Sequence, residues 1–282
     1  MKNIVVRALS GAVYVGLIVA SIVMRKTMTD WIFLTVFSLF ISLGIHEIHH
    51  IAKKEGGKSP LLLQLLDIAG GISLFGALYL QTGGMGGKAL WLVPFAVYFL
   101  IRAIVQLYMP RYDALMLSMR SALSLLYVAV PVSLLHAISA LTDDRLILAM
   151  FIFIWVYDTG AFLVGSSIGR HRLFERVSPK KSWEGVVGGV LTCLVVAWLI
   201  PTYAGDFFSG PLSIWFWMGM AAVVAVFATF GDLFESLLKR TVGVKDSGNL
   251  IPGHGGILDR IDSLLFAAPA LLVYIVVYQE LC

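Results

Sequence analysis

Charged residues are scarce in this sequence. They make up 13% of its 282 residues, whereas roughly a quarter of the residues in an ordinary soluble domain are charged. Hydrophobic residues account for 59%, which leaves too little polar surface to cover a water-soluble fold of this size. The apolar residues also occur in long runs with the charges gathered between them, which is the pattern of membrane-spanning segments. The composition therefore excludes an ordinary soluble enzyme and indicates an integral membrane protein.

Cysteines and processing signals are also few. The two cysteines, Cys193 in an apolar run and Cys282 at the last position, cannot form a disulfide framework. The stretch from Met1 to Met24 resembles a secretory signal, but no small-residue cleavage site precedes Arg25. We therefore expect this stretch to be the first membrane span. The sequence has no internal repeat and no low-complexity tract.

Only helices and closed barrels can span a bilayer, because every backbone polar group must be satisfied inside the protein. Apolar runs of about 20 residues without alternation of period two select helices. The sequence therefore predicts an all-α, polytopic integral membrane protein with about nine transmembrane helices. The fifth segment is longer than one crossing needs and contains Arg120 and Pro131, so we expect it to be broken or strongly tilted. The nine segments lie at about residues 4–24, 31–48, 61–81, 89–109, 114–141, 146–168, 184–204, 211–235 and 258–279.

Lysine and arginine are distributed unevenly between these segments. The N-terminus and the second, fourth, sixth and eighth loops carry 14 of these cations, and the other loops carry four. Because positively charged loops tend to remain on the cytoplasmic side of a membrane, we expect the N-terminus to be cytoplasmic. With nine spans, the C-terminus then lies outside.

Carboxylates in the second half of the chain gather near one membrane level. An ionised side chain inside a bilayer costs several kcal/mol unless it is paired or faces a wet cavity. Asp232 ends the eighth span, and Asp259 and Asp262 begin the ninth, three residues apart and therefore on one helix face. Clustered carboxylates at a site that handles phosphates usually hold magnesium. Simple ion pairing with Arg260 or a neighbouring lysine is the alternative.

The loop between the eighth and ninth spans combines cations with glycines. Lys239, Arg240 and Lys245 supply positive charge, and the run Gly253–Gly256 lets backbone N–H groups approach an anion closely. The loop leads into the N-terminus of the ninth helix, which also favours anions. A basic loop that only obeys topology explains the lysines but not the glycine run followed by Asp-Arg-Ile-Asp.

The 27 residues from Ser236 to Asp262 contain Ser-x-apolar-Lys-Arg, Lys-Asp-x-Gly and Ile-Pro-x-His-Gly-Gly-apolar-x-Asp-Arg-apolar-Asp. This stretch resembles the signature of the phosphatidate cytidylyltransferase family, with every fixed position filled. Asp158–Ala161 and Ser178–Gly185 also resemble blocks of that family, although Ser182 stands where the family more often has threonine. The resemblance covers roughly residues 155–265, and the first 145 residues resemble the family only in hydropathy and span number.

The resemblance implies an enzyme of phospholipid biosynthesis that transfers CMP from CTP to phosphatidate, giving CDP-diacylglycerol and pyrophosphate. It places a catalytic region of about four helices in residues 146–282 and leaves residues 1–145, with about five helices, without a clear role. Mg²⁺ is the expected cofactor, with room for a second cation. A multi-pass protein of the inner (plasma) membrane with a cytoplasmic active site is expected, with no nucleic-acid partner. The sequence leaves open whether it is a monomer or a homodimer.

The same resemblance implies the site residues. The expected metal ligands are Asp232, Asp259 and Asp262, and these three form the expected catalytic set with Asp246 and His254. The expected substrate-binding residues are Asp158, Lys180, Lys181, Ser236, Lys239, Arg240, Lys245, Gly255, Gly256 and Arg260.

Two alternatives come from other classes of protein. The segment His46–His50 matches the H-E-x-x-H pattern of an intramembrane zinc metalloprotease, but a pattern with three fixed positions is weak. These proteases also have a second motif that supplies an aspartate ligand. Residues 249–259 imitate it only loosely, because the spacing differs and Arg260 replaces the expected glycine. We therefore expect these histidines and Glu47 to form a wet cap on the second span. An ion-coupled transporter with Asp67, Asp158 and Asp232 as a relay is the second alternative, but the chain has no matching halves with broken spans.

Single cysteines test the predicted orientation. We expect Lys54→Cys, Arg172→Cys and Lys245→Cys, in a background without Cys193 and Cys282, to resist an impermeant thiol reagent added outside intact cells. The reason is that the loops near 47–60, 169–183 and 236–257 hold most of the loop cations. The measurement is the mass shift of the purified protein, and labelling of Lys245→Cys from outside would contradict the predicted orientation.

Overall fold

The structure is almost entirely helical. It is a computed structural model that describes residues 2–25, 30–56, 60–83, 92–109, 112–208, 212–248, 250 and 255–281, with the backbone alone for residues 2–8 and 53–56. The prediction of an all-α fold is confirmed, and within these ranges one two-stranded hairpin is the exception. In chain order the elements are α1 (Lys2–Val23), α2 (Trp31–Gly56), α3 (Leu61–Thr82), α4 (Val93–Leu107), α5 (Ala114–Ser124), the π-helical turn η2 (Leu125–Ala129), α6 (Val130–Leu141), α7 (Asp144–Ile168), β1 (Arg172–Phe174), β2 (Ser178–Ser182), α8 (Trp183–Tyr203), α9 (Ile214–Thr241) and α10 (Leu258–Leu281).

Within the described residues, seven helical stretches are long and apolar enough to cross a membrane. They are Trp31–Ala52, Leu61–Thr82, Ala114–Leu141, Asp144–Ile168, Trp183–Tyr203, Ile214–Thr241 and Leu258–Leu281. Two shorter apolar helices, Leu9–Val23 and Val93–Leu107, fall where the first and fourth segments were expected. The count of about nine membrane segments therefore holds as an approximation.

The fifth membrane segment is irregular, as the sequence predicted. The π-helical turn η2 separates α5 from α6, and the backbone N–H of Val130 donates to the carbonyl oxygen of Leu125, five residues earlier. Pro131 follows directly. Because proline has no N–H and its ring crowds the carbonyl four residues before it, a wider turn at this point avoids the clash.

The chain divides into two compact units. Unit 1 comprises Met1–Ala140 and Thr241–Ile261, and unit 2 comprises Leu141–Arg240 and Asp262–Cys282. The middle of the 236–262 stretch therefore belongs to the same unit as the N-terminal helices. The division predicted at residue 145 concerned catalytic function and stays a prediction.

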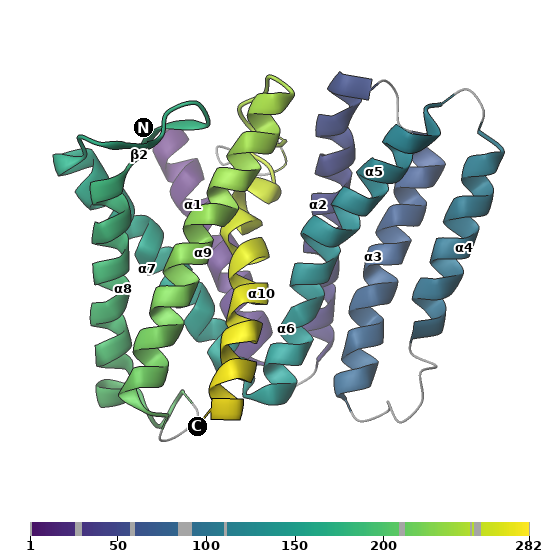
Figure 1. Ribbon diagram of the computed structural model, residues 1–282. Helices are drawn as coiled ribbons and strands as arrows, with labels where there is room; N and C mark the ends of the chain where they lie inside the picture. The colour runs from purple at the N-terminus through teal and green to yellow at the C-terminus, as the bar shows by residue number, and fades with distance from the viewer. Residues whose placement is uncertain are drawn as a thin grey trace. The chain divides into compact units, whose positions relative to one another are not determined.

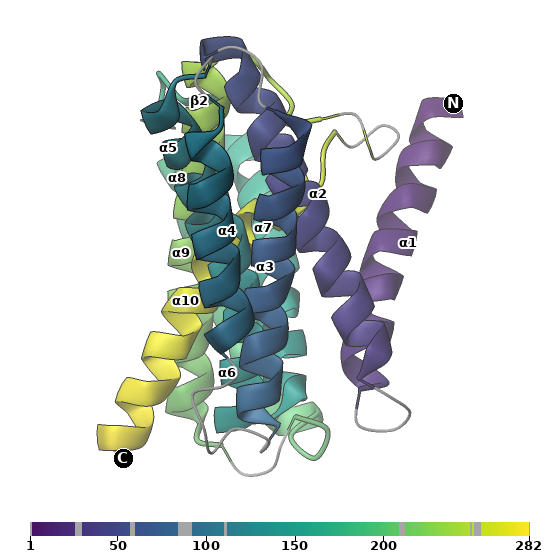
Figure 2. The ribbon, with the colours of Figure 1, turned by 90° about the vertical axis from the view of Figure 1, so that its right-hand side faces the viewer.

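In unit 1, α2 packs against α1 and α3, and α3 packs against α4 (Figures 1 and 2). Aromatic rings fill part of this core. The ring centroids of Phe33 and Phe37 lie 4.4 Å apart, and those of Phe75 and His136 also lie 4.4 Å apart. Because lipid is as apolar as these rings, close packing contributes more than the exclusion of water to holding such helices together.

A buried carboxylate joins four helices of unit 1. Asp67 on α3 is fully buried and accepts hydrogen bonds from His49 Nε2 and Arg102 Nε, each at 2.9 Å, from Tyr98 OH at 3.0 Å and from Ser121 Oγ at 2.7 Å. These donors replace the water that the carboxylate loses on burial. The network therefore ties α2, α4 and α5 to α3, and it occupies Asp67, one of the three carboxylates that the transporter hypothesis would use.

In unit 2, α7 and α8 pack closely because glycines line α8. A Cβ atom at Gly188 would overlap the side chain of Val164, and one at Gly189 would lie 2.6 Å from the ring of Tyr157. Small residues of this kind let two membrane helices approach each other closely. The hairpin formed by β1 and β2 joins the two helices at one end (Figure 1).

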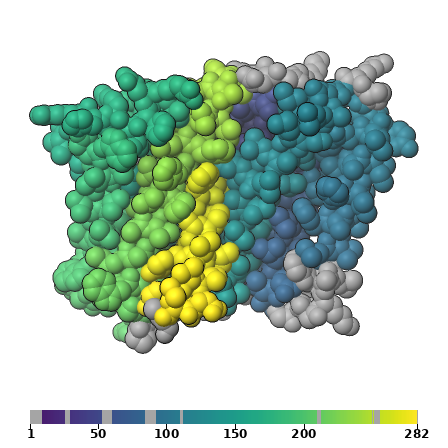
Figure 3. Space-filling model, viewed as in Figure 1, coloured from purple at the N-terminus to yellow at the C-terminus, as the bar shows by residue number. Residues whose placement is uncertain are grey.

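The helices α9 and α10 also pack closely in unit 2. A Cβ atom at Gly231 would overlap the carbonyl oxygen of Asp262, and the hydroxyl of Ser263 donates to the carbonyl oxygen of Ala228 at 3.4 Å. Figure 3 shows α9, in light green, adjoining α10, in yellow, along one face. Since Asp232 follows Gly231 directly, this contact holds Asp232 close to the first turns of α10.

Replacing Gly189 tests the packing of α7 and α8. We expect Gly189→Ala to lower the unfolding temperature of the detergent-solubilised protein, because the added methyl group meets the ring and the backbone oxygen of Tyr157 at 2.6 and 2.9 Å. Overpacking of this kind typically costs about 1–3 kcal/mol. Gly76→Ala is the matched control, since a Cβ atom there meets nothing within 4 Å and alanine favours a helix over glycine by about 1 kcal/mol. Equal unfolding temperatures for the two variants would contradict the packing argument.

Candidate active site

The block Ser178–Gly185 forms a strand, a helix cap and the first turn of α8. β2 pairs with β1 in antiparallel register, with Arg172 opposite Ser182. Ser182 is the N-cap of α8, and its hydroxyl accepts the backbone N–H of Gly185 at 3.2 Å. Residues 169–183 were expected to form a plain loop, so this hairpin was not predicted. The strand fixes the direction of the two lysines that it carries.

Lys181 of this strand pairs with a carboxylate of α9. Its ammonium lies 2.6 Å from Asp232 Oδ2, and both side chains are partly exposed, by 26% and 33%. The hydroxyl of Ser236, one turn further along α9, donates to Asp232 Oδ1 at 3.3 Å. The structure therefore brings together a residue expected to bind substrate and a residue expected to bind metal. Lys180, the other lysine of the strand, is exposed.

Four carboxylates of unit 2 interact electrostatically around the start of α10. Asp262 experiences the charges of Asp232, Glu235 and Asp158, which come from α9 and α7. Of these, Glu235 is buried and accepts a bond from Lys239 Nζ at 2.5 Å. Lys239 was expected to bind phosphate, and it is almost fully buried beside this partner. The arrangement concentrates negative charge with two lysines to balance it.

These carboxylates offer the oxygen ligands that magnesium prefers. With the side chains as they lie in the described part of the chain, no group of three or more His, Cys, Asp or Glu residues is arranged to hold a metal ion. Mutual repulsion between Asp232 and Asp262 fits a site at which a bound cation would draw the carboxylates together. The magnesium site therefore stays a prediction, with chemically suitable residues.

The loop residues of the 236–262 stretch belong to unit 1, where Asp259 orders them. Its Oδ2 accepts the N–H of Ser247 at 3.1 Å, the hydroxyl of Ser247 at 3.0 Å and the N–H of Gly256 at 2.8 Å. Gly255 has a φ of +82°, and a Cβ atom there would lie 2.5 Å from the same oxygen. This oxygen of Asp259, a residue expected to be a metal ligand, thus accepts donors from the loop.

The remaining loop residues of the expected site differ in exposure. The side chains of Lys245, Asp246 and Arg260 are exposed. The carbonyl oxygen of Arg260 accepts a bond from Tyr14 OH at 2.9 Å, which ties α1 to the first turn of α10. Arg240, in unit 2, donates through Nε to the carbonyl oxygen of Val177 at 3.4 Å. His254 lies outside the described residues.

The prediction of a wet cap on the second span is wrong for His49, which is fully buried, and for Glu47. Glu47 is only 2% exposed. Its Oε1 accepts the N–H of Ile257 at 2.8 Å, and its Oε2 accepts the N–H of Leu258 at 2.9 Å and the hydroxyl of Ser247 at 2.7 Å. A carboxylate held in this way does not act as the base of a zinc protease. The signal that was available in the sequence is an acidic residue inside an apolar helix, which needs a partner.

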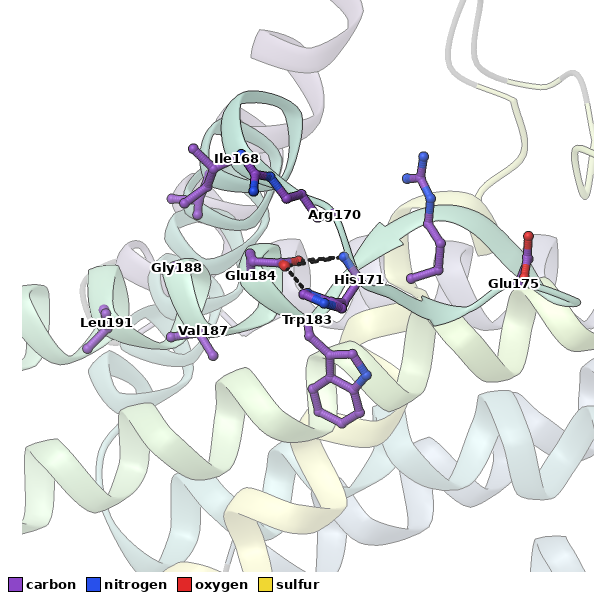
Figure 4. Close-up of a pocket in the computed structure, with 11 residues that line it drawn as sticks. Ile168, Arg170, His171, Glu175, Trp183, Glu184, Val187, Gly188 and Leu191 are labelled. Atoms are coloured by element: carbon purple, nitrogen blue, oxygen red, sulfur yellow. Dashed lines mark hydrogen bonds and ion pairs between the residues drawn. The ribbon is translucent and has the colours of Figure 1, made fainter.

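A groove of about 1010 Å³ lies beside the hairpin in unit 2. Its walls include Val164, Val187 and Leu191 of α7 and α8, and its rim includes Arg170 and His171. The backbone N–H of His171 lies 3.2 Å from Glu184 and its Nδ1 lies 2.6 Å from the same carboxylate, as Figure 4 shows. The groove thus has an apolar wall and a rim of mixed charge, since Glu175 and Glu184 line it as well.

The chain matches the pattern of the cytidylyltransferase family over residues 5–278. It belongs to this family. Among similar proteins, the phosphatidate cytidylyltransferase of Haemophilus influenzae is 45% identical over 124 residues, 44% of this chain and 43% of the relative. The phosphatidate cytidylyltransferase of Thermotoga maritima is 50% identical over 116 residues, 41% of this chain and 43% of the relative. The one from Staphylococcus aureus is 43% identical over 130 residues, 46% of this chain and 48% of the relative.

The chain thus spans about half the length of the curated relatives it matches. Any site that handles phosphate groups needs positive charge around them. In unit 2, Lys181 offers such a charge next to Asp232.

A charge swap tests whether Lys181 and Asp232 form an ordinary ion pair. We expect Lys181→Asp and Asp232→Lys each to reduce cytidylyl transfer by about a hundredfold or more. The double variant should not recover activity, because the two residues are expected to meet different ligands, phosphate and metal. Lys181→Arg, which keeps the charge, is the control and should lose less. Recovery of most activity in the double variant would mean that the pair only stabilises the fold.

Proposed function

We propose that this protein transfers CMP from CTP to phosphatidate, giving CDP-diacylglycerol and pyrophosphate. The observation that carries the proposal is the cluster around the start of α10 in unit 2, where Lys181 meets Asp232 and several carboxylates surround Asp262. Membership of the cytidylyltransferase family and the names of the similar bacterial proteins support the substrates.

The proposed reaction needs charge neutralisation more than an activated nucleophile. An oxygen of the phosphatidate phosphate attacks the α-phosphorus of CTP, and the bond from that phosphorus to the bridging oxygen of pyrophosphate breaks on the opposite side. A phosphate monoester is already anionic, so no strong general base is required. Such transfers depend on alignment and on cations that balance the charge of the transferring group.

Within this proposal, Asp232 and Asp262 hold magnesium, and Asp158 adds negative charge nearby. When bound, the ion neutralises phosphate oxygens of the triphosphate. Asp259 was also an expected ligand, but one of its oxygens accepts the backbone N–H groups of Ser247 and Gly256. We therefore propose that the main role of Asp259 is to hold the loop in shape.

The proposed phosphate ligands are side-chain cations. In unit 2, Lys180 has an exposed side chain, and Lys181 is partly exposed beside Asp232. In unit 1, Lys245 and Arg260 have exposed side chains. We place these residues at the cytoplasmic surface of a plasma membrane, where CTP is available. The apolar helices keep the lipid substrate in the same bilayer.

Magnesium titration of conservative variants tests the proposed site. The purified protein, radiolabelled CTP and phosphatidate are combined in detergent micelles, and lipid-soluble label is measured against magnesium concentration. We expect Asp232→Asn and Asp262→Asn to lower turnover about a hundred- to a thousandfold, with partial recovery at high magnesium. Asp113→Asn is the control, because Asp113 caps α5 and asparagine is an equally good cap.

Near-normal rates and magnesium dependence in both Asp→Asn variants would remove these residues from the metal site. Absence of lipid-soluble label with the unsubstituted protein would contradict the proposed reaction itself.

A further inference from the structure

The carboxylate of Glu47 fills the N-terminus of α10. The first N–H groups of a helix have no partner within the helix, and they form a ready site for an anion. In this helix the N–H groups of Ile257 and Leu258 donate to Glu47, and the N–H of Gly256 donates to Asp259. An anion from the protein itself therefore already satisfies this helix end.

Two glycines of the loop make room for this carboxylate. A Cβ atom at Gly248 would lie 2.8 Å from Glu47 Oε1, and one at Gly256 would overlap both oxygens of Glu47 and the hydroxyl of Ser247. The sequence predicted that loop glycines let N–H groups approach an anion closely. In this structure the anions that they approach are Glu47 and Asp259.

Glu47 is itself held firmly. His49, two residues further along α2, bonds to the fully buried Asp67 at 2.9 Å. One turn earlier, Gly44 lies against Leu258, which is fully buried, so that a Cβ atom at Gly44 would be 3.4 Å from the Leu258 side chain. The start of α10 thus meets α2 through apolar contact as well as through hydrogen bonds.

Ser247 couples the two carboxylates of the loop. Its hydroxyl lies 2.7 Å from Glu47 Oε2 and 3.0 Å from Asp259 Oδ2. A hydroxyl has one proton and donates to one acceptor at a time. The backbone N–H of Ser247 donates to Asp259 as well, so the loop is fixed at both its middle and its end.

We infer that Glu47 is a positioning residue of the proposed transfer reaction, which anchors Ser247 and the segment Gly256–Leu258 and closes the N-terminus of α10 to the phosphates of the substrates. The phosphates are then held by side-chain cations of the site and not by this helix end. The expected effect on the reaction rate rests on the proposed function. The anchor itself does not, because it consists of hydrogen bonds within the protein.

Hydrogen–deuterium exchange and kinetics of Glu47→Gln test the inference in detergent micelles. Glutamine replaces one acceptor oxygen with an NH₂ donor that faces N–H groups, so the amides of Ile257 and Leu258 should exchange at least about tenfold faster. A displaced loop should lower kcat/KM for CTP by about ten- to a hundredfold. Most of that loss should fall on kcat, because the cations keep their charge while a displaced loop aligns the reacting groups less well.

His50→Gln is the matched control on the same helix. His50 is exposed, and it would be a ligand in a zinc protease but plays no part in the anchor. We expect unchanged amide exchange in the loop and kcat/KM within about twofold of the unsubstituted protein. Ser247→Ala, which removes one donor and keeps the carboxylate, gives a smaller increase in exchange and replaces Glu47→Gln if that variant does not fold.

Unchanged exchange at Ile257 and Leu258 in Glu47→Gln would overturn the anchor, whatever the activity. Faster exchange with unchanged kcat/KM would overturn the positioning role. Tighter CTP binding by Glu47→Gln would mean that the carboxylate competes with a substrate phosphate, which contradicts a closed helix end. The exchange result does not depend on catalysis, so failure of the proposed function remains distinguishable from failure of the anchor.

Discussion

A carboxylate that leaves water must be matched by donors or by cations, and the pairing of Glu47 with the start of α10 meets this condition across 210 residues of sequence. The contact determines the local shape of the loop. Gly248 and Gly256 have no side chain that would collide with the carboxylate. Asp259 is then left to accept bonds from the middle of the loop. The contact also determines where α10 begins. The chemistry proposed for the exposed side chains of this loop depends on that frame.

The buried and partly buried carboxylates of this chain are matched in different ways, and the difference separates structural from functional roles. Asp67 is saturated by four side-chain donors, and Glu47 is saturated by two amides and a hydroxyl. Around Asp262, in contrast, four carboxylates lie within electrostatic range of one another, and lysines pair with two of them, Asp232 and Glu235. Negative charge gathered in this way is costly in a membrane, and a bound cation reduces that cost. For this reason the cluster in unit 2 is the better candidate for magnesium.

The sequence predicted the membrane helices well because apolar runs report directly on contact with lipid. It also predicted the break in the fifth segment, since Pro131 acts through its own backbone. The hairpin β1–β2 was missed because its strands are short and carry many charges, which leaves no apolar alternation to detect. The role of Glu47 was missed for another reason. Periodicity describes the helix on which a residue lies, and it contains no information about a partner in a distant segment.

The anchor offers a physical role for the N-terminal helices. They were expected to resemble the family only in hydropathy and span number, but the family match covers them from residue 5. Packing among apolar helices in lipid can be achieved by many sequences, because side chains of similar volume replace one another at little cost. No other side chain replaces a carboxylate that accepts two backbone N–H groups, because the bonds need both of its oxygens and its negative charge. Within unit 1, residue identity should therefore matter most at Glu47 and at the His49–Asp67 contact that supports its helix. The aromatic core around Phe33 needs only the right volume.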